Sequence, residues 1–248
     1  VELGPTLRKL VTAARFNPSL PYLSFLCINF DAPVIKEAAS WFLDGVFLNY
    51  NSSYLEQMLE QLLDEDDSLE ITRFLRAVDV RIDGFRVEKA PEWRGQRVFV
   101  KHEVDGKGYE LRLSEESAGT QKLMGLASFL LAALERGGTV VVDELDAKLH
   151  PKLLRYVILL FKDPEVNKSG AQLIFSSQDV STMRNDVFRR DEIWFAARGE
   201  WEASQLWSLA DIHEANGNLV SKNAAFDKQY LSGRYGADPY LTRIEEWD

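Results

Sequence analysis

The sequence has few residues that form covalent crosslinks or bind soft metals. Its 248 residues include one cysteine, Cys27, and three histidines. A single cysteine excludes an intrachain disulfide and a cysteine-based zinc site, and it favours a reducing compartment. We therefore expect Cys27 to be a core residue of a protein that resides in the cytoplasm.

The sequence also lacks a long apolar run and an excess of positive charge. No stretch approaches the roughly 18 apolar residues that span a bilayer, and the N-terminal residues do not resemble a signal peptide. The formal net charge of −10 disfavours attraction of the whole chain to nucleic acid or to an anionic membrane. We expect no membrane contact, and nucleic-acid binding would require a local basic patch.

The rest of the composition is that of an ordinary globular protein. Hydrophobic residues make up 46% of the chain, enough for a large buried core. The first residue is Val1 rather than a methionine. We therefore expect the chain to be a piece of a longer protein.

The hydrophobic period divides the chain into three regions. Residues 1–79 are mainly helical, and residues 80–113 alternate with a period of two, which predicts a small antiparallel sheet with a hairpin at Asp105 and Gly106. Residues 114–248 alternate between helices and apolar strands, which predicts a mostly parallel sheet flanked by helices on both faces. The fold class is therefore α/β.

Several local predictions accompany this division. We expect a buried strand over residues 22–30, a helix N-cap at Asp31, and a helix over residues 34–43 with Trp41 and Phe42 in the core. Residues 52–70 predict an amphipathic helix that runs into an acidic loop. His102 is expected to lie on a sheet face.

The third region has its own sequence of elements. We expect helices over residues 121–135 and 151–161, and strands over residues 139–142, 172–176 and 192–196. Trp194 and Phe195 on the last strand are expected to be buried. Arg189 and Arg190 lie close to acidic residues and are expected to form a solvated charge cluster.

An acid pair follows the strand predicted over residues 139–142. Asp143 and Glu144 come directly after this β-branched run, and Asp146 follows them. Because ligands bind at the carboxyl ends of parallel strands, we expect these acids at a site edge. One carboxylate could hold a water of a Mg²⁺ shell while the next activates an attacking water. A helix cap without a ligand would explain the same pattern.

A loop of small residues precedes the helix predicted over residues 121–135. Ser117, Gly119 and Gln121 lie in this loop. Free backbone N–H groups and the positive end of the helix dipole suit a phosphate there. An N-cap that binds nothing is the alternative explanation for the loop alone.

The order of these motifs resembles a known family. The small-residue loop, the Asp–Glu pair and residues 147–150 and 176–179 are similar to the signature loop, Walker B, D-loop and switch of ABC-class ATPase heads. These heads occur in transporters, in SMC- and RecF-like proteins and in prokaryotic "AAA family" ATPases linked to restriction and phage defence. The resemblance covers about residues 114–241, and it implies the C-terminal lobe of such a head.

The resemblance implies a role for each matching residue. Glu144 would be the catalytic glutamate, and Asp143 would hold Mg²⁺ through water. Gln178 would contact the γ-phosphate in place of the usual histidine. The remaining residues are the signature residues Ser117, Gly119 and Gln121, which would bind nucleotide in trans, and the D-loop residues Asp146, Lys148 and His150. The implied cofactors are ATP and Mg²⁺.

The family's phosphate-binding loop is not found in these 248 residues. No G-x-x-x-x-G-K-[ST] run occurs, so the β- and γ-phosphates would have no cradle here. We expect that the P-loop lobe is absent from this chain, which alone would then be inactive. We also expect Gly119→Asp to block ATP-dependent dimerisation without changing the thermal midpoint.

The predicted function is part of an ATPase switch that dimerises around ATP–Mg²⁺ in prokaryotic genome defence or maintenance. Its partner would be a second copy or a P-loop-bearing copy, with a nuclease or another effector acting downstream. Two alternatives remain open. One is a non-catalytic module for dimerisation or partner docking, and the other is a metal-dependent nuclease whose ligands are Asp143, Glu144 and Asp146.

Overall fold

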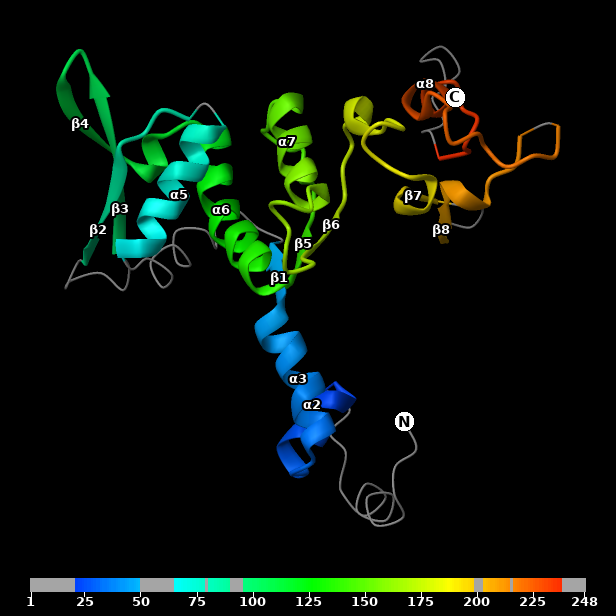
Figure 1. Cartoon of the computed structure of the whole chain (residues 1–248), viewed down its shortest axis with the longest axis horizontal. Helices are drawn as coiled ribbons and strands as arrows, with labels where there is room; N and C mark the ends of the chain where they lie inside the picture. The colour runs from blue at the N-terminus through cyan, green and yellow to red at the C-terminus, as the bar shows by residue number, and fades with distance from the viewer. Residues whose placement is uncertain are drawn as a thin grey trace, which may run out of the picture.

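The computed structural model describes residues 21–49, 65–78, 80–89, 96–198, 203–214 and 216–237 (Figure 1). The helices are α2 (Tyr22–Asn29), α3 (Pro33–Gly45), α5 (Glu65–Ala77), α6 (Ala118–Arg136), α7 (Pro151–Lys162) and α8 (Phe226–Leu231). The strands are β1 (Val46–Asn49), β2 (Gly84–Lys89), β3 (Gln96–Val104), β4 (Lys107–Arg112), β5 (Thr139–Val142), β6 (Gln172–Phe175), β7 (Trp194–Arg198) and β8 (Ser204–Ser208). Short 3₁₀ helices are η2 (Leu113–Glu115), η3 (Val180–Thr182), η4 (Arg190–Glu192) and η6 (Leu209–Asp211).

A parallel sheet lies at the centre of the described chain. Its strand order is β1-β5-β6, and both strand pairs are parallel, as the sequence predicts. The strand β1 was not predicted from the sequence, and it follows directly after Gly45, the last residue of α3. It brings the N-terminal region into direct contact with the strand that carries the acid pair.

The two faces of this sheet have different surroundings. Val140 and Val142 point to one face and are buried in the main core. Leu48 and Ile174 align with Val141 across the three strands and are 50% and 56% exposed. Because neighbouring side chains alternate between faces, Val140 and Val142 face the main core, while Leu48 and Ile174 lie on the other face. The parallel sheet with its helices confirms the predicted α/β fold class.

The antiparallel sheet β2-β3-β4 confirms the second predicted region. Its β3–β4 hairpin turns at Asp105 and Gly106, whose φ angles of 51° and 74° are those of a type I′ turn. Val98 and Val100 are buried in the main core, which also contains Ile71, Phe74 and Leu75 of α5.

The three predicted regions do not pack as separate units. One buried cluster takes residues from α5, β3, α6, β5 and α7, including Leu75, Val100, Leu126, Val140 and Leu154. The boundaries at residues 79 and 113 therefore mark changes of secondary structure within one core. A second cluster is formed by Ile193, Phe195, Leu209, Val220, Phe226 and Tyr235. None of the helices in the described part of the chain is long and apolar enough to cross a membrane.

The N-terminal predictions require correction. The predicted strand over residues 22–30 is the helix α2, and α3 begins after Ala32 rather than at a cap on Asp31. Trp41 and Phe42 are 53% and 57% exposed, because α2 and α3 project away from the sheets (Figure 1). The small buried cluster that these two helices form consists of Phe25, Leu26 and Ile35 instead. The predicted acidic loop belongs in part to α5, which includes residues 65–67. Most of the helix predicted over residues 52–70 lies outside the described residues.

The last predicted strand of the parallel sheet belongs elsewhere. β7 pairs antiparallel with β8 in a separate two-stranded sheet. Phe195 is buried as predicted, but Trp194 is 58% exposed because it points to the other face of this small sheet.

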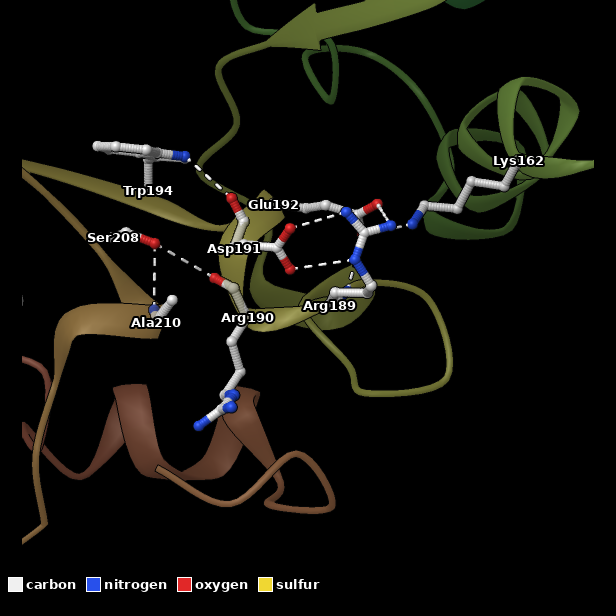
Figure 2. Close-up of polar contacts among 8 residues, drawn as sticks. All are labelled: Lys162, Arg189, Arg190, Asp191, Glu192, Trp194, Ser208 and Ala210. Atoms are coloured by element: carbon white, nitrogen blue, oxygen red, sulfur yellow. Dashed lines mark hydrogen bonds and ion pairs between the residues drawn. The ribbon is translucent and has the colours of Figure 1, made fainter. Parts of the chain in front are cut away.

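Charged residues of η4 connect this second cluster to α7. Figure 2 shows the Arg189 guanidinium facing Asp191 and Glu192, with an Nη2–Oδ2 distance of 2.7 Å to Asp191. Lys162 of α7 donates to Glu192 at 2.5 Å. Arg189 therefore belongs to the predicted solvated cluster, whereas Arg190 is partly buried and donates to the carbonyl oxygen of Val220.

Two glycines allow a test of the close contact between the end of α6 and the segment before β6. Gly137 ends α6 with φ of 81°, and a Cβ there would collide with the carbonyl oxygen of Ser169. Gly170 has a similar φ of 72° and open space around it. We expect Gly170→Ala to lower the free energy of unfolding by about 1–2 kcal/mol through backbone strain. Gly137→Ala should cost about 1–3 kcal/mol more, because it adds the collision.

Urea denaturation of both variants measures this difference. Equal losses of stability in the two variants would show that Gly137 is required for its backbone angle alone.

Candidate functional site

The acid pair lies at the carboxyl edge of the parallel sheet, as predicted. Asp143 and Glu144 follow β5, and Ser176 follows the neighbouring strand β6. The Ser176 hydroxyl donates to Oδ1 of Asp143 at 2.5 Å and accepts the backbone N–H of Glu144 at 2.8 Å. The sequence placed Ser176 in the switch but did not predict these two contacts.

Glu144 has a left-handed backbone, with φ of 49°. This conformation is unfavourable for a residue with a Cβ, so neighbouring contacts must hold it. Its N–H is bound by Ser176, and its carbonyl oxygen accepts from Lys122 Nζ at 2.5 Å and from the N–H of Ala147 at 3.0 Å. The side chain of Glu144 is exposed at the edge.

Asp146 connects the turn after β5 to the segment after β6. Both of its carboxylate oxygens lie 3.3 Å from the backbone nitrogen of Gln178, which donates to them. The side chain of Gln178 is exposed. Asp143, Glu144, Asp146 and Gln178 are therefore brought together, although the helix α7 and the strand β6 separate the three acids from Gln178 in the sequence.

The signature-like loop begins α6. Ser117 is the N-cap, and its Oγ accepts the N–H of Thr120 at 3.1 Å. Gln121 turns back into the loop, where its side-chain nitrogen donates to the carbonyl oxygen of Glu116 at 2.7 Å. The Ser117 side chain is exposed, whereas the amide nitrogen of Gln121 is engaged within its own loop.

Gly119 packs against the D-loop of the same chain. A Cβ at this position would lie 2.9 Å from the carbonyl oxygen of Lys148, which has a left-handed φ of 65°. The expectation that Gly119→Asp leaves the thermal midpoint unchanged is therefore wrong, because the site has no space for a side chain.

The last predicted D-loop residue, His150, is a helix cap. Its Nδ1 accepts the backbone N–H of Lys152 at 3.1 Å, and Pro151 occupies the first position of α7. This contact requires Nδ1 to be unprotonated. His102 lies on β3, the central strand of the antiparallel sheet, and contacts Oε1 of Glu116, next to the signature-like loop, at 2.6 Å.

Lys122 was not singled out by the sequence, where it is one more charged residue of a helix. Burial lowers the pKa of its ammonium group, and Lys148 lowers it further, while Asp146 and Glu144 raise it. The ammonium group of Lys122 is therefore partly desolvated and is influenced by the charges of Asp146 and Glu144.

The donors at the edge suit Mg²⁺ bound through water. Mg²⁺ prefers carboxylate and hydroxyl oxygens and usually keeps several waters, and Asp143 offers an exposed carboxylate beside a hydroxyl. Within the described residues, no three His, Cys, Asp or Glu side chains are grouped so that they could hold a metal ion. The nuclease alternative, with Asp143, Glu144 and Asp146 as joint ligands, is therefore not supported.

A family model matches most of this chain. The family is described as "AAA domain, putative AbiEii toxin, Type IV TA system", and the match covers residues 15–184. It includes the signature-like loop, the acid pair and residues 176–179. It begins well before residue 114 and ends before the segment over residues 226–241 that the sequence resemblance also included.

Two solved structures are similar to parts of the chain. One is described as "Structural biochemistry of ATP-driven dimerization and DNA stimulated activation of SMC ATPases". It is 16% identical, has a TM-score of 0.42, and the similarity covers 64% of this chain and 89% of that chain. The other is "Crystal structure of the SmcHead bound to the C-winged helix domain of ScpA", also 16% identical, with a TM-score of 0.37 and coverage of 61% and 43%. Neither assigns a role to a residue of this chain. A search of curated proteins finds no match.

Gly119 provides a test of the contact between loop and D-loop. In an uncrowded helix, replacing glycine by alanine would stabilise by up to about 1 kcal/mol. We expect Gly119→Ala to destabilise by about 1–3 kcal/mol instead, because its Cβ meets the Lys148 carbonyl oxygen at 2.9 Å. The exposed neighbour Ala118 supplies the control Ala118→Ser, which should change stability little.

Thermal and urea denaturation of the two variants checks this sign. A gain of stability in Gly119→Ala would mean that the loop and the D-loop are further apart.

Proposed function

Since this chain belongs to the family described as "AAA domain, putative AbiEii toxin, Type IV TA system", we propose that it is part of an ATP-binding and ATP-hydrolysing switch. This family assignment agrees with the resemblance of the chain's motifs to those of ABC-class ATPase heads. The observation that carries the proposal is the grouping of Asp143, Glu144, Asp146 and Gln178 at one sheet edge, beside the start of α6.

In this proposal each acid has a separate task. Glu144, exposed and fixed through its backbone, orients the attacking water and takes its proton. Asp143 would hold a water of the Mg²⁺ shell, and Ser176 donates a hydrogen bond that keeps that carboxylate in place. The metal would supply charge stabilisation for the transferred phosphoryl group. Gln178 offers a neutral contact to the γ-phosphate, where a histidine is usual in the resembling family.

The start of α6 would serve the opposite subunit. Ser117 is exposed at the N-terminus of a long helix, where N–H groups and the helix dipole favour a phosphate. Two subunits facing each other would thus form sites that take Ser117 from one chain and Glu144 from the other. The partner would be a second copy or a P-loop-bearing copy of the same kind.

The phosphate cradle must come from outside these 248 residues, because they contain no P-loop sequence. The family's description names a putative toxin of a type IV TA system. We propose a role in prokaryotic genome defence or maintenance, with a nuclease or another effector as partner, because the resemblance of the motifs to ABC-class heads implies it. A non-catalytic docking module remains the second candidate, and the same lack of a P-loop sequence favours it. The reading frame of the parent gene distinguishes these two functions, since an upstream P-loop in frame would argue against the docking module.

We expect the 248-residue chain alone to bind ATP weakly and not to hydrolyse it. Only the water-activating and partner-facing parts of a site are present in its sequence. Isothermal titration calorimetry with ATP and Mg²⁺ is the direct measurement. A dissociation constant in the micromolar range would contradict the proposal that the phosphate cradle comes from outside these 248 residues.

In the full-length protein with a P-loop, Glu144→Gln should abolish turnover and preserve ATP-dependent association. The amide keeps the shape but cannot accept a proton, so we expect a loss of roughly 10²–10⁴-fold in kcat. Turnover close to that of the parent would assign the general base to another residue.

Ala118→Asp is the matched comparison for this experiment. It places a carboxylate in the signature-like loop at an exposed position, without the collision expected at Gly119. It should block ATP-dependent association through repulsion of the phosphate, while Glu144→Gln retains it. Sedimentation with ATP measures both variants, and equal association of the two would mean that the loop is only a helix cap.

A further inference from the structure

Lys122 connects the signature-like loop to the backbone of the acid pair. It lies on α6, five residues after the N-cap Ser117, and its Nζ donates to the carbonyl oxygen of Glu144 at 2.5 Å. The contact joins two segments that the proposed function assigns to two different nucleotides. Ser117 would serve the nucleotide of the partner, and Glu144 would serve the nucleotide of its own subunit.

The peptide units on both sides of Glu144 are held by different elements. Ser176, at the end of β6, accepts the N–H, and Lys122, from α6, donates to the carbonyl oxygen. A left-handed φ of 49° persists at a glutamate only when the surroundings hold it. The direction of the Glu144 side chain therefore depends on the position of α6 as well as on the sheet.

A second contact joins the same helix to the same turn. Gly119 approaches the carbonyl oxygen of Lys148 so closely that a Cβ would lie 2.9 Å from it. Lys148, like Glu144, has a left-handed backbone. The start of α6 therefore contacts the turn after β5 at Glu144, through Lys122, and at Lys148, through Gly119. A shift of this end of α6 would displace both residues of the turn.

The charges and the partial burial around Lys122 strengthen its contact with the Glu144 carbonyl oxygen. Its ammonium group is partly desolvated and faces the carboxylates of Asp146 and Glu144 and the ammonium of Lys148. A hydrogen bond from a charged donor in such surroundings is stronger than one in bulk water.

We propose that Lys122 is a positioning residue that couples occupancy of the signature-like loop to the orientation of Glu144 in the same chain. The proposal rests on the proposed role of Glu144 in activating water. When a phosphate of the opposite subunit binds at Ser117, α6 and Lys122 hold the Glu144 peptide in its working position. One subunit thereby senses its partner's nucleotide and adjusts hydrolysis of its own.

Hydrogen exchange on the 248-residue chain tests the contact itself. Lys122→Met keeps most of the side-chain stem and removes the donor. We expect exchange at the amides of Glu144, Leu145 and Ala147 to accelerate roughly tenfold, as for loss of a hydrogen bond to a charged group. The amides of β5 should be unchanged. Lys122→Arg, which retains a charged donor, should keep part of the protection.

The control is Lys107→Met, which removes an exposed lysine at the start of β4 in the other sheet. It should leave exchange in the turn after β5 unchanged. Unchanged exchange at Glu144 in Lys122→Met would overturn the proposal. A uniform acceleration through α6 and β5 would overturn it too, because it would make Lys122 a residue of general stability.

Turnover of the full-length protein separates this inference from the proposed function. Lys122→Met should lower kcat at least tenfold, with little change in KM, and should reduce any cooperativity between the two sites. If exchange accelerates at Glu144 and kcat stays unchanged while Glu144→Gln is inactive, the coupling is wrong. If Glu144→Gln is also active, the proposed function itself fails.

Discussion

The arrangement of the acidic edge depends on one hydroxyl group. Ser176 Oγ donates to Asp143 and accepts the N–H of Glu144, so a single atom orients both members of the acid pair. It can do so only because β5 and β6 are direct neighbours, with Val142 aligned to Phe175. A slip of β6 by one residue would turn Ser176 to the other face of the sheet and would also turn Leu173 and Phe175 away from the core. The hydrophobic core therefore fixes the register, and the register fixes the acids.

Much of this could be predicted from local sequence. The β-branched run over residues 139–142 gave the bounds of β5 without error, and Gly137 marked the end of α6 through its left-handed backbone. Asp105 and Gly106 identified a hairpin for the same reason. In each case the information lies within a few neighbouring residues, which is where propensity and turn chemistry act.

Features that depend on distant partners could not be predicted in this way. β1 is four residues long, follows α3 directly, and becomes a strand by pairing with β5. Trp41 resembles a core residue, yet α3 extends away from the sheets and leaves it exposed. The contacts of Ser176 and Lys122 join residues more than twenty positions apart, and no periodicity encodes them. The residues grouped at the sheet edge were thus proposed as a site from motifs, but the contacts that hold them could be seen only in the fold.

Of the three residues with a Cβ and a positive φ in the described part of the chain, Glu144 and Lys148 lie between β5 and α7. Glu144 and Lys148 both have left-handed backbones, each costing about 1–2 kcal/mol for a residue with a Cβ. The structure offsets the first with Ser176 and Lys122 and accommodates the second only because position 119 is a glycine. His150 and Pro151 then fix the start of α7 just beyond the turn. The turn is held by β5 at one end and by α7 at the other, and α6 contacts the residues between them. A small movement of α6 must therefore change the turn, and the exposed carboxylate of Glu144 would move with it.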